Sequence, residues 1–327
     1  MKAIVYHEYG PPDVLQLEDV DQPVVKGDEV LVRVLGAAVN PGDWFWLSGT
    51  PYLFRPMIGL SKPRNKVLGL AIAGQVEAVG SNVTQFQPGY EVYAEISKGG
   101  FAEYACVPED VLALKPSNLT FEQAAAVPLV GVTALQGLRD IGRVQPGQKV
   151  LINGASGGVG TFAVQIAKLF GAEVTGVCST RNVDLIRSIG ADHVIDYTQE
   201  DFTRNGQQYD LILDNVGNRS LSECRSVLNP KGVYIASFGQ PDHRWLGPLA
   251  QLLRMFVLSP FVSQKMVTFV QKPNMEDLHF LKELIEAGKV TPVIDKTYPL
   301  NETAEALGYY GQGHTRGKVV ITVAVAD

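Results

Sequence analysis

The stretch of this sequence best suited to chemistry is a glycine-rich loop, Gly154-Ala155-Ser156-Gly157-Gly158-Val159-Gly160. Gly157 would let the backbone approach a pyrophosphate closely, and Gly160 would let a following helix pack closely on the preceding strand. Ala155 takes the place of the first glycine in the usual G-x-G-x-x-G pattern. Because an apolar strand precedes the loop and an amphipathic helix follows it, we predict a dinucleotide site with the phosphates at the helix N-terminus.

The end of the next strand indicates which dinucleotide this site prefers. An Asp or Glu there would bind the adenosine ribose 2′-hydroxyl of NAD. The chain instead reads Cys178-Ser179-Thr180-Arg181, and its next carboxylate is Asp184. Arg181 is either a solvated residue at a helix start or a ligand for a 2′-phosphate. Since the missing acid and the added base agree, we predict NADPH as the cofactor.

The elements that must hold this loop are predicted by the apolar pattern after residue 120. Short apolar strands alternate there with helical segments, and Thr120 is a candidate N-cap for the first of them. Strands are predicted at 150–152, 173–177, 193–195, 210–214, 232–236 and 266–270, and helices at 122–128, 159–170 and 183–189. This alternation predicts an α/β fold with a doubly wound parallel sheet.

The first third of the chain is rich in short strands and turns, which predicts a compact, largely antiparallel β domain. Its strands are predicted at 29–34, 74–79 and 90–93. A similar pattern returns after residue 290, and a last strand at 318–323 would rejoin the β domain. We therefore predict a β-rich domain of residues 1–122 and 291–327, with a nucleotide-binding domain of residues 123–290 inserted in it.

Composition argues against several other classes of protein. The 327 residues, 46% hydrophobic and 19% charged, suit a globular protein of two domains. The net charge of −6 comes without a basic block, so we expect no nucleic-acid partner. Three scattered cysteines and an N-terminus without a signal-like apolar run favour the cytoplasm. The apolar run at 246–262 contains Arg254 and two prolines, so we expect a buried or interface helix there and no membrane partner.

Several further motifs make the whole chain similar to quinone-oxidoreductase-like members of the medium-chain dehydrogenase/reductase superfamily. Each is moderately specific, whereas their order and spacing over nearly the full length are very specific. Besides the glycine loop they are Val39-Asn40-Pro41-Gly42-Asp43, Gly99-Gly100-Phe101-Ala102-Glu103-Tyr104, Ala124-Ala125-Ala126-Val127-Pro128, Gly131-Val132-Thr133-Ala134, the segment 190–197, and Gly317-Lys318-Val319-Val320. The resemblance implies a GroES-like β-rich catalytic domain, a Rossmann domain and an active-site cleft between them.

The resemblance also implies roles for particular residues. They are Ser156, Gly157, Gly158, Val159 and Gly160 around the pyrophosphate, Ser179, Arg181 and Tyr197 around the 2′-phosphate, Val216, Gly217, Ser237 and Phe238 near the nicotinamide, and Asn40 and Tyr52 facing the nicotinamide and substrate. Tyr197 has an alternative role as an aromatic that covers the end of a strand, and Tyr52 as an ordinary pocket-wall residue.

Zinc-dependent relatives bind a catalytic zinc through a Cys, a Gly-His-Glu segment and a further ligand. Here Asn40 stands at the Cys position, and residues 69–74 offer no ligand side chain at the Gly-His-Glu position. The cysteine-rich lobe of a structural zinc is absent between Val92 and Phe101. We therefore expect no metal site. Ala71, where relatives often carry Asp, is a departure that bears on the floor of the cleft.

Without a Lewis acid, the charge that develops on hydride transfer must be met by Tyr52, a backbone N–H or water. This favours reduction of a quinone, enone or enoyl-type activated double bond over oxidation of a simple alcohol. Trp44, Phe45 and Trp46, with Tyr52 and Phe54, would either line an apolar cleft for a conjugated small-molecule substrate or pack beneath a loop.

Two other classes of function stay open. The sequence shows no obvious proton donor, which is compatible with an NADPH-binding crystallin-like or sensor protein with little turnover. A zinc alcohol dehydrogenase is the third and remote alternative. The strand at 266–270 would leave an open sheet edge, and the family resemblance suggests that two such edges pair in a homodimer.

Overall fold

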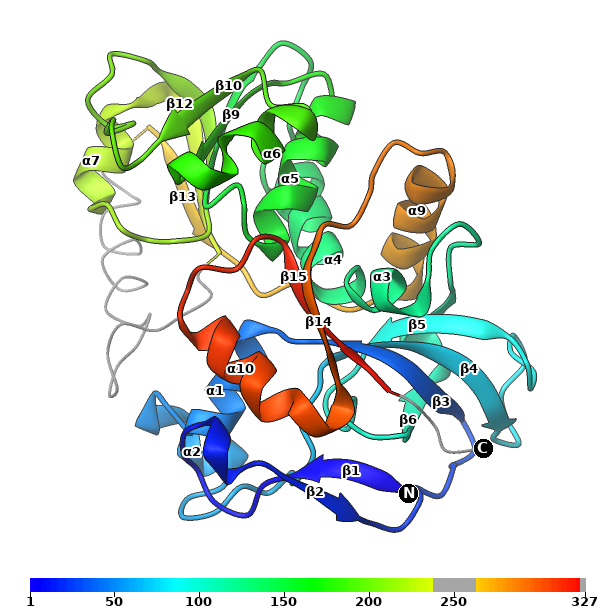
Figure 1. Ribbon diagram of the computed structural model, residues 1–327. Helices are drawn as coiled ribbons and strands as arrows, with labels where there is room; N and C mark the ends of the chain where they lie inside the picture. Colours follow the sequence, from blue (N-terminus) through cyan, green and yellow to red (C-terminus); the bar gives the residue numbers. More distant parts are fainter. Residues whose placement is uncertain (238–262, 324–327) are drawn as a thin grey trace. The chain divides into compact units, whose positions relative to one another are not determined.

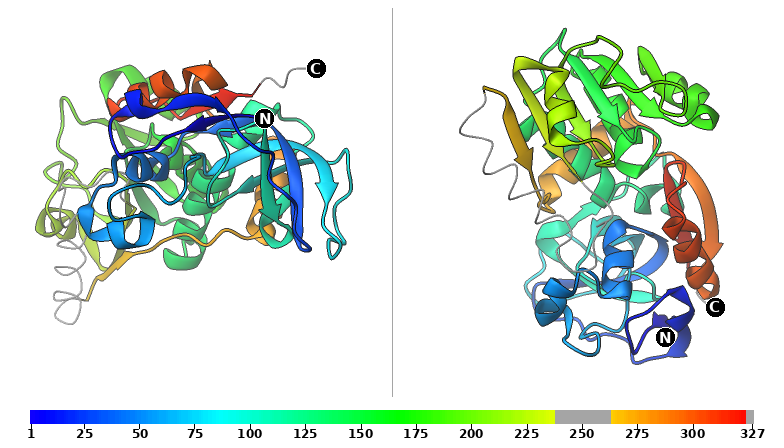
Figure 2. Two further views of the ribbon diagram at one scale, coloured as in Figure 1. Left: turned by 90° about the horizontal axis from the view of Figure 1, so that it is seen from below. Right: turned by 90° about the vertical axis from the view of Figure 1, so that its left-hand side faces the viewer.

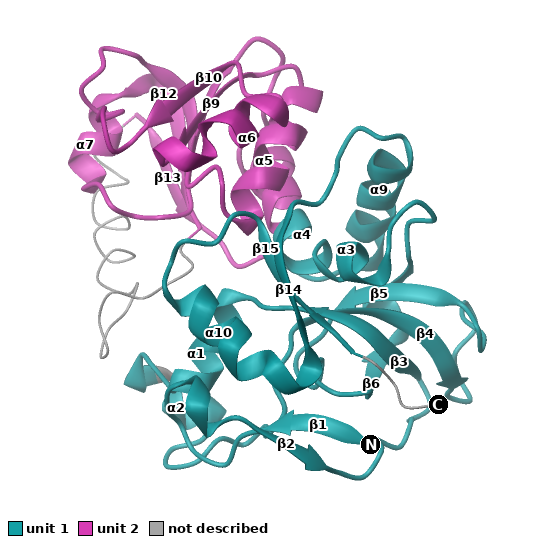
Figure 3. Ribbon diagram, in the orientation of Figure 1, with its two compact units in different colours: residues 1–132, 272–327 teal, residues 133–271 magenta. Residues whose placement is uncertain are grey.

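A computed structural model describes residues 1–237 and 263–323, the side chain of Phe54 excepted (Figure 1). Contacts divide the chain into a first unit, Met1–Val132 with Lys272–Asp327, and a second unit, Thr133–Gln271 (Figure 3). The boundaries predicted from the sequence, after residues 122 and 290, follow a change in apolar pattern, whereas this division follows contacts.

A six-stranded parallel sheet forms the middle of the second unit, in the order β10-β9-β8-β11-β12-β13. The strands are β8 (Lys149–Asn153), β9 (Glu173–Cys178), β10 (His193–Asp196), β11 (Tyr209–Asp214), β12 (Leu228–Ala236) and β13 (Lys265–Thr268). The connecting helices are α5 (Gly158–Leu169), α6 (Val183–Ser188) and α7 (Leu221–Ser226). The strand order runs outward in both directions from β8 and β11, so the predicted doubly wound sheet is confirmed.

Continuous apolar runs explain why these strands pair in parallel. A parallel strand is covered on both faces and therefore needs apolar side chains at successive positions. Val150, Leu151 and Ile152 of β8 are fully buried, and so is most of α5 over residues 160–167. The glycine loop is thus held between two buried elements.

A seven-stranded sheet forms the core of the first unit, in the order β14-β15-β3-β4-β5-β7 with β6 paired to β3. These strands are β3 (Glu29–Ala38), β4 (Ala71–Val79), β5 (Glu91–Glu95), β6 (Tyr104–Pro108), β7 (Leu112–Leu114), β14 (Ile294–Pro299) and β15 (Lys318–Thr322). β15 pairs antiparallel with β3, with Val320 opposite Ala38, so the predicted return of the last strand is confirmed. Helix α10 (Thr303–Gly311) packs on β14 and β15 (Figure 2).

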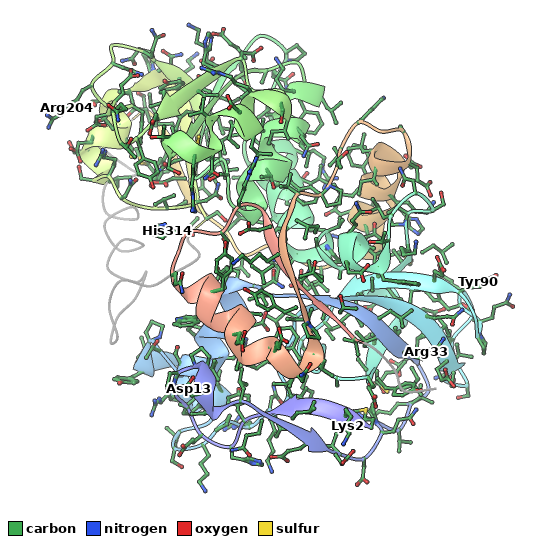
Figure 4. The ribbon with its side chains drawn as sticks, in the orientation of Figure 1. Lys2, Asp13, Arg33, Tyr90, Arg204 and His314 are labelled. Carbon is green, nitrogen blue, oxygen red and sulfur yellow. The ribbon has the colours of Figure 1, made fainter. Side chains whose placement is uncertain are left out.

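Polar side chains link neighbouring strands of the first unit. Lys2 of β1 (Lys2–Val5) forms an ion pair with Asp19 of β2 (Gln16–Asp19), the partner strand in a separate antiparallel pair. Arg33 of β3 donates from Nη2 to Oε1 of Gln75 on β4. Lys2 and Arg33 are both labelled in Figure 4. Such cross-strand pairs stabilise a sheet modestly and help to specify its register.

Three helical segments differ from the prediction. The aromatic stretch at Trp44 is the helix α1 (Pro41–Ser48) and not a run of turns. Helix α3 (Phe121–Ala125) is capped by Thr120 as predicted, but it ends before residue 128. Pro128 disfavours helical backbone at the residue before it, and it begins a separate helix, α4 (Pro128–Gln136). Helix α9 (Met275–Glu286) had no counterpart in the prediction.

The predicted helix at 246–262 lies outside the described residues. Within the described part of the chain, no helix is long and apolar enough to cross a membrane.

Candidate cofactor and active site

The glycine loop joins β8 to α5 at the carboxyl end of the parallel strands. Gly154 has a φ of +77°, so the tight turn falls on this glycine and not on Ala155. Ala155 N then donates to Val177 O of β9 at 3.0 Å, which anchors the loop to the neighbouring strand. At Gly160 a Cβ would lie 2.2 Å from Gly154 O, so the fold itself requires glycine there. The predicted packing role of Gly160 has this physical basis.

Gly157 is glycine for a different reason. The nearest atom that a Cβ at Gly157 would meet is Gly154 O, at 3.5 Å, which is ordinary contact. Its φ of −80° and ψ of 177° are also open to any residue. Neither packing nor backbone strain therefore demands glycine at the N-cap of α5. Close approach of a phosphate does, because backbone N–H groups at a helix N-terminus bind anions best when no side chain covers them.

Asn182, which the sequence did not single out, connects the glycine loop with the end of β9. Its Nδ2 donates to Ser156 Oγ at 3.0 Å and to Ser179 Oγ at 3.3 Å. It ends the 3₁₀ turn η5 (Thr180–Asn182) and is only 3% exposed. The structure thus brings two predicted cofactor ligands together around one buried amide. An uncharged residue beside the missing acid was the only sequence signal for it.

Arg181 and Tyr197 lie near these serines in the fold, and so does a carboxylate that a search along the chain did not find. Arg181 is exposed, and Tyr197, 47% exposed, follows β10 and donates its N–H to Cys178 O of β9. Asp196, at the end of β10, accepts from Thr180 Oγ1 at 2.6 Å. It also accepts from Thr198 N and Oγ1, at 3.0 and 2.8 Å. Hydrogen bonds from these hydroxyls lower the pKa of the Asp196 carboxyl.

The segment after β11 is held by a buried carboxylate. Asp214 is fully buried, and its Oδ1 accepts from Val216 N at 3.0 Å and from Gly217 N at 2.9 Å. The same residue accepts from Asn153 Nδ2 and Tyr234 Oη, both at 2.8 Å. A Cβ on Gly154 would meet Val216 Cγ2 at 2.7 Å, so this segment lies against the glycine loop.

Ser237 follows β12 and donates its N–H to Asp214 O at 2.8 Å. Phe238 lies outside the described residues. The structure therefore brings Val216, Gly217 and Ser237 to the same end of the sheet as the glycine loop.

In the first unit, Asn40 is the centre of a buried polar network. It is fully buried, and its Nδ2 donates to Ala38 O at 2.8 Å. Its Oδ1 accepts from Lys318 Nζ at 2.6 Å. Asp43, three residues on, accepts from Asn40 N at 2.8 Å and from Gly69 N at 2.9 Å. Both ends of the Asn40 amide are thus used inside this unit, and its contact with a nicotinamide or substrate stays a prediction.

Burial governs the ionisation of this network. It raises the pKa of the Asp43 carboxyl to about 7, against the hydrogen bonds from Asn40 and Gly69 that lower it. It also lowers the pKa of the Lys318 ammonium to about 7, against the negative charge of Asp43. The motifs around residues 40 and 318 were recognised from the sequence, but the contact between them was not.

Tyr52 lies in the 3₁₀ turn η2 (Tyr52–Phe54) of the first unit and is half-buried. The Arg55 guanidinium stacks 4.6 Å from the centre of its ring. Trp44, Phe45 and Trp46 are also half-buried; Trp46 packs on the core of this unit, and Trp44 lies against Gly311 of α10. Packing therefore accounts for part of the surface of both tryptophans, and a substrate-facing role for the cluster stays a prediction.

Within residues 1–237 and 263–323, no group of three or more His, Cys, Asp or Glu side chains is arranged to hold a metal ion. Asn40 occupies the expected position of the catalytic Cys and is engaged by Lys318. The expectation of no metal site stays a prediction.

Comparison with known proteins decides the family. Residues 26–117 match the family "Alcohol dehydrogenase GroES-like domain", and residues 189–321 match "Zinc-binding dehydrogenase". The chain is 36% identical to the 2-methylene-furan-3-one reductase of Solanum lycopersicum, over 98% of this chain and 79% of the relative. It is also 36% identical to the chloroplastic NADPH-dependent alkenal/one oxidoreductase of Arabidopsis thaliana, with the same shares covered. The quinone oxidoreductase of Coxiella burnetii has a similar structure, with a TM-score of 0.86 at 30% identity over 99% of both chains.

The chain belongs to the quinone-oxidoreductase-like medium-chain dehydrogenases/reductases. The family expected from the sequence motifs is therefore confirmed, together with its GroES-like and Rossmann-type folds. As a quinone-oxidoreductase-like medium-chain reductase, the protein is an NAD(P)H-dependent oxidoreductase.

Proposed function

We propose that this enzyme uses NADPH, without a metal ion, to reduce a carbon–carbon double bond conjugated to a carbonyl, in an enone, an enoyl thioester or a quinone. The observation that carries the proposal is the donor cluster at the ends of β8 and β9, where Ser156 and Ser179 share Asn182 and Arg181 is exposed beside them. The relative named an NADPH-dependent alkenal/one oxidoreductase supports both the cofactor and the substrate class.

Asp196 is the strongest argument against NADPH, because a carboxylate near the end of β9 could instead bind a ribose 2′-hydroxyl. Its oxygens, however, already accept three hydrogen bonds from Thr180 and Thr198. These contacts make Asp196 a link between β9, β10 and the segment that follows. In our proposal Ser179, Arg181 and Tyr197 bind the 2′-phosphate, and Ser156 and the first backbone N–H groups of α5 bind the pyrophosphate.

When bound, NADPH supplies a hydride to the carbon β to the carbonyl. The carbonyl oxygen then gains negative charge, which a hydrogen-bond donor in the protein must stabilise. We assign this donor role to the Tyr52 hydroxyl, since the stacked Arg55 guanidinium holds its ring in a defined orientation. Val216, Gly217 and Ser237 would border the nicotinamide, and Asp214 holds the first two of them by their N–H groups.

The test is steady-state oxidation of NADPH and of NADH with an enal, an enone, an enoyl thioester and a quinone, before and after treatment with a metal chelator. We expect turnover of at least one conjugated substrate, a kcat/KM for NADPH at least about tenfold that for NADH, and no effect of the chelator. Tight NADPH binding without turnover of any substrate would instead favour the crystallin-like or sensor function. Loss of activity on chelation would rule out the metal-free part of the proposal.

We also propose that the enzyme is a cytoplasmic homodimer. β13 stands at one end of the six-strand order and, among the described strands, pairs only with β12. Pairing of two such edges would satisfy their backbone groups. Sedimentation at micromolar concentration should give twice the 35.5 kDa chain mass, and a monomer would contradict this part of the proposal.

A further inference from the structure

The side chain of Asn182 is placed where it does not do what an asparagine at that position usually does. Asn182 is the N-cap of α6, where an Asn side-chain oxygen normally accepts from a backbone N–H of the first turn. No such bond is made here, and the buried Oδ1 of Asn182 has no hydrogen-bond partner. Its Nδ2 points instead to the two serines. Helix capping therefore does not account for this residue.

The direction of these two hydrogen bonds determines what the serines can do. Because Nδ2 is the donor, Ser156 Oγ and Ser179 Oγ are the acceptors, and each hydroxyl keeps its own hydrogen for another partner. Both serines are half-buried, and within the described residues neither hydroxyl donates to a protein acceptor. Two hydroxyl donors around one amide suit an acceptor with several oxygens, and a phosphate group is such an acceptor.

An unpartnered Oδ1 makes this arrangement unfavourable in the free protein. With the amide turned over, Oδ1 could accept from both hydroxyls, but their hydrogens would then be used up inside the protein. The observed orientation is the one that leaves both hydrogens free for an anion.

We propose that Asn182 is a positioning residue that presents the hydroxyls of Ser156 and Ser179 as donors to two separate phosphates of the cofactor, the pyrophosphate and the 2′-phosphate. The proposal rests on the NADPH site assigned above and adds a determinant of cofactor choice to it. One buried amide then couples the two ends of the adenosine half of the site. A change at residue 182 should affect both phosphates, whereas a change at either serine should affect one.

Binding of nucleotides in the absence of substrate tests this. Asn182→Leu has a similar size and removes the donor. We expect it to weaken NADPH binding by roughly tenfold or more, and to weaken both adenosine 5′-diphosphate and adenosine 2′,5′-bisphosphate in calorimetric titrations. Ser156→Ala should weaken chiefly the diphosphate, and Ser179→Ala chiefly the 2′,5′-bisphosphate. Asn229→Ala is the matched control, because it removes an asparagine bond to Asp210 at the opposite end of the sheet and should leave all affinities unchanged.

A double-mutant cycle separates this role from a merely structural one. In the Ser156→Ala/Ser179→Ala background, Asn182→Leu should cause little further loss of NADPH affinity, because its two partners are already gone. An undiminished loss in that background would overturn the proposal, and so would wild-type affinity in Asn182→Leu itself. If Asn182→Leu does not fold, Asn182→Asp, which keeps the size and removes the donor, serves in the same cycle.

The two proposals fail in different ways. A wild-type enzyme that binds NADH more tightly than NADPH would contradict the proposed cofactor. In that case the diphosphate titrations still judge Asn182 through Ser156, where an unchanged affinity in Asn182→Leu counts against the proposal.

Discussion

Lys318 Nζ donates a 2.6 Å hydrogen bond to Asn40 Oδ1, although 278 positions separate the two residues in the chain. The antiparallel pairing of β15 with β3 brings them together. Lys318 Nζ also donates to Val39 O at 2.6 Å. The last strand of the chain therefore does more than complete the sheet, because its first residue holds the amide of Asn40 in place.

We expect Lys318→Met to destabilise the protein. The methionine keeps the volume but leaves two buried acceptors, Val39 O and Asn40 Oδ1, without a donor. Each unsatisfied acceptor costs about 1–3 kcal/mol, so the free energy of unfolding at pH 7 should fall by about 2–4 kcal/mol. Urea unfolding followed by circular dichroism measures this. Lys289→Met, at an exposed position, is the control and should change stability little. Equal stability of the two variants would mean that the buried ammonium is not needed.

The two glycines of the cofactor loop should respond differently to alanine. Gly160→Ala would place a Cβ 2.2 Å from Gly154 O, so we expect a loss of about 1–3 kcal/mol in unfolding free energy. Gly157→Ala meets no atom closer than 3.5 Å and should keep wild-type stability. It should nevertheless bind NADPH about tenfold more weakly, because its methyl group occupies the approach of the phosphate. Fluorescence titration and urea unfolding of both variants check this, and normal cofactor affinity in Gly157→Ala would argue against a phosphate at that position.

Replacing Arg181 should change cofactor preference more than cofactor binding in general. Arg181→Glu replaces a positive charge beside the proposed 2′-phosphate with a negative one. We expect the ratio of the NADPH to the NADH dissociation constants to rise by about tenfold or more, since charge-assisted hydrogen bonds are lost. Arg187→Glu makes the same charge change elsewhere on the same segment, where Arg187 lies 3.9 Å from Asp184. The two variants should differ clearly in this ratio, and identical ratios would place the 2′-phosphate elsewhere.

Glu286 should make the stability of the first unit depend on acid. Its carboxylate accepts from Lys282 Nζ at 2.8 Å and from Ser117 N and Oγ, both at 2.9 Å, and so ties α9 to the segment before α3. The Lys282 hydrogen bond, with those from Ser117, lowers the pKa of Glu286 from 4.5 to about 2. A carboxyl with a lowered folded-state pKa contributes stability that is fully present above its unfolded pKa. That stability is lost as the pH falls through the folded pKa.

Wild type should therefore exceed Glu286→Gln in stability by about 1 kcal/mol at pH 7, a modest figure because the ion pair is partly solvated. The difference should shrink between about pH 4.5 and pH 2. Unfolding curves at pH 7, 4 and 2.5 follow it. A difference that stays constant with pH would show that the carboxylate charge plays no part.

The sequence predicted the second unit well because its signals are local. Apolar runs at 150–152 and 210–214, with a glycine loop after the first, need only neighbouring residues to indicate a buried parallel strand and the turn that follows. The first unit was harder to predict, since helix α1 carries half-buried aromatics that show no clear helical period. Pro128, which separates α3 from α4, was present in the sequence but was included in one predicted helix.

By itself, the sequence determined which residue types line the cofactor loop, that Arg181 follows β9 in place of an acid, and that the last strand returns to the β domain. Only the tertiary structure decided which of these residues meet. Asp196 reaches Thr180 because β10 lies beside β9, Lys318 reaches Asn40 because β15 lies beside β3, and Asn182 turns its nitrogen toward two serines. Such contacts depend on strand order and register, which arise from packing across the whole sheet and not from the residues adjacent in the chain.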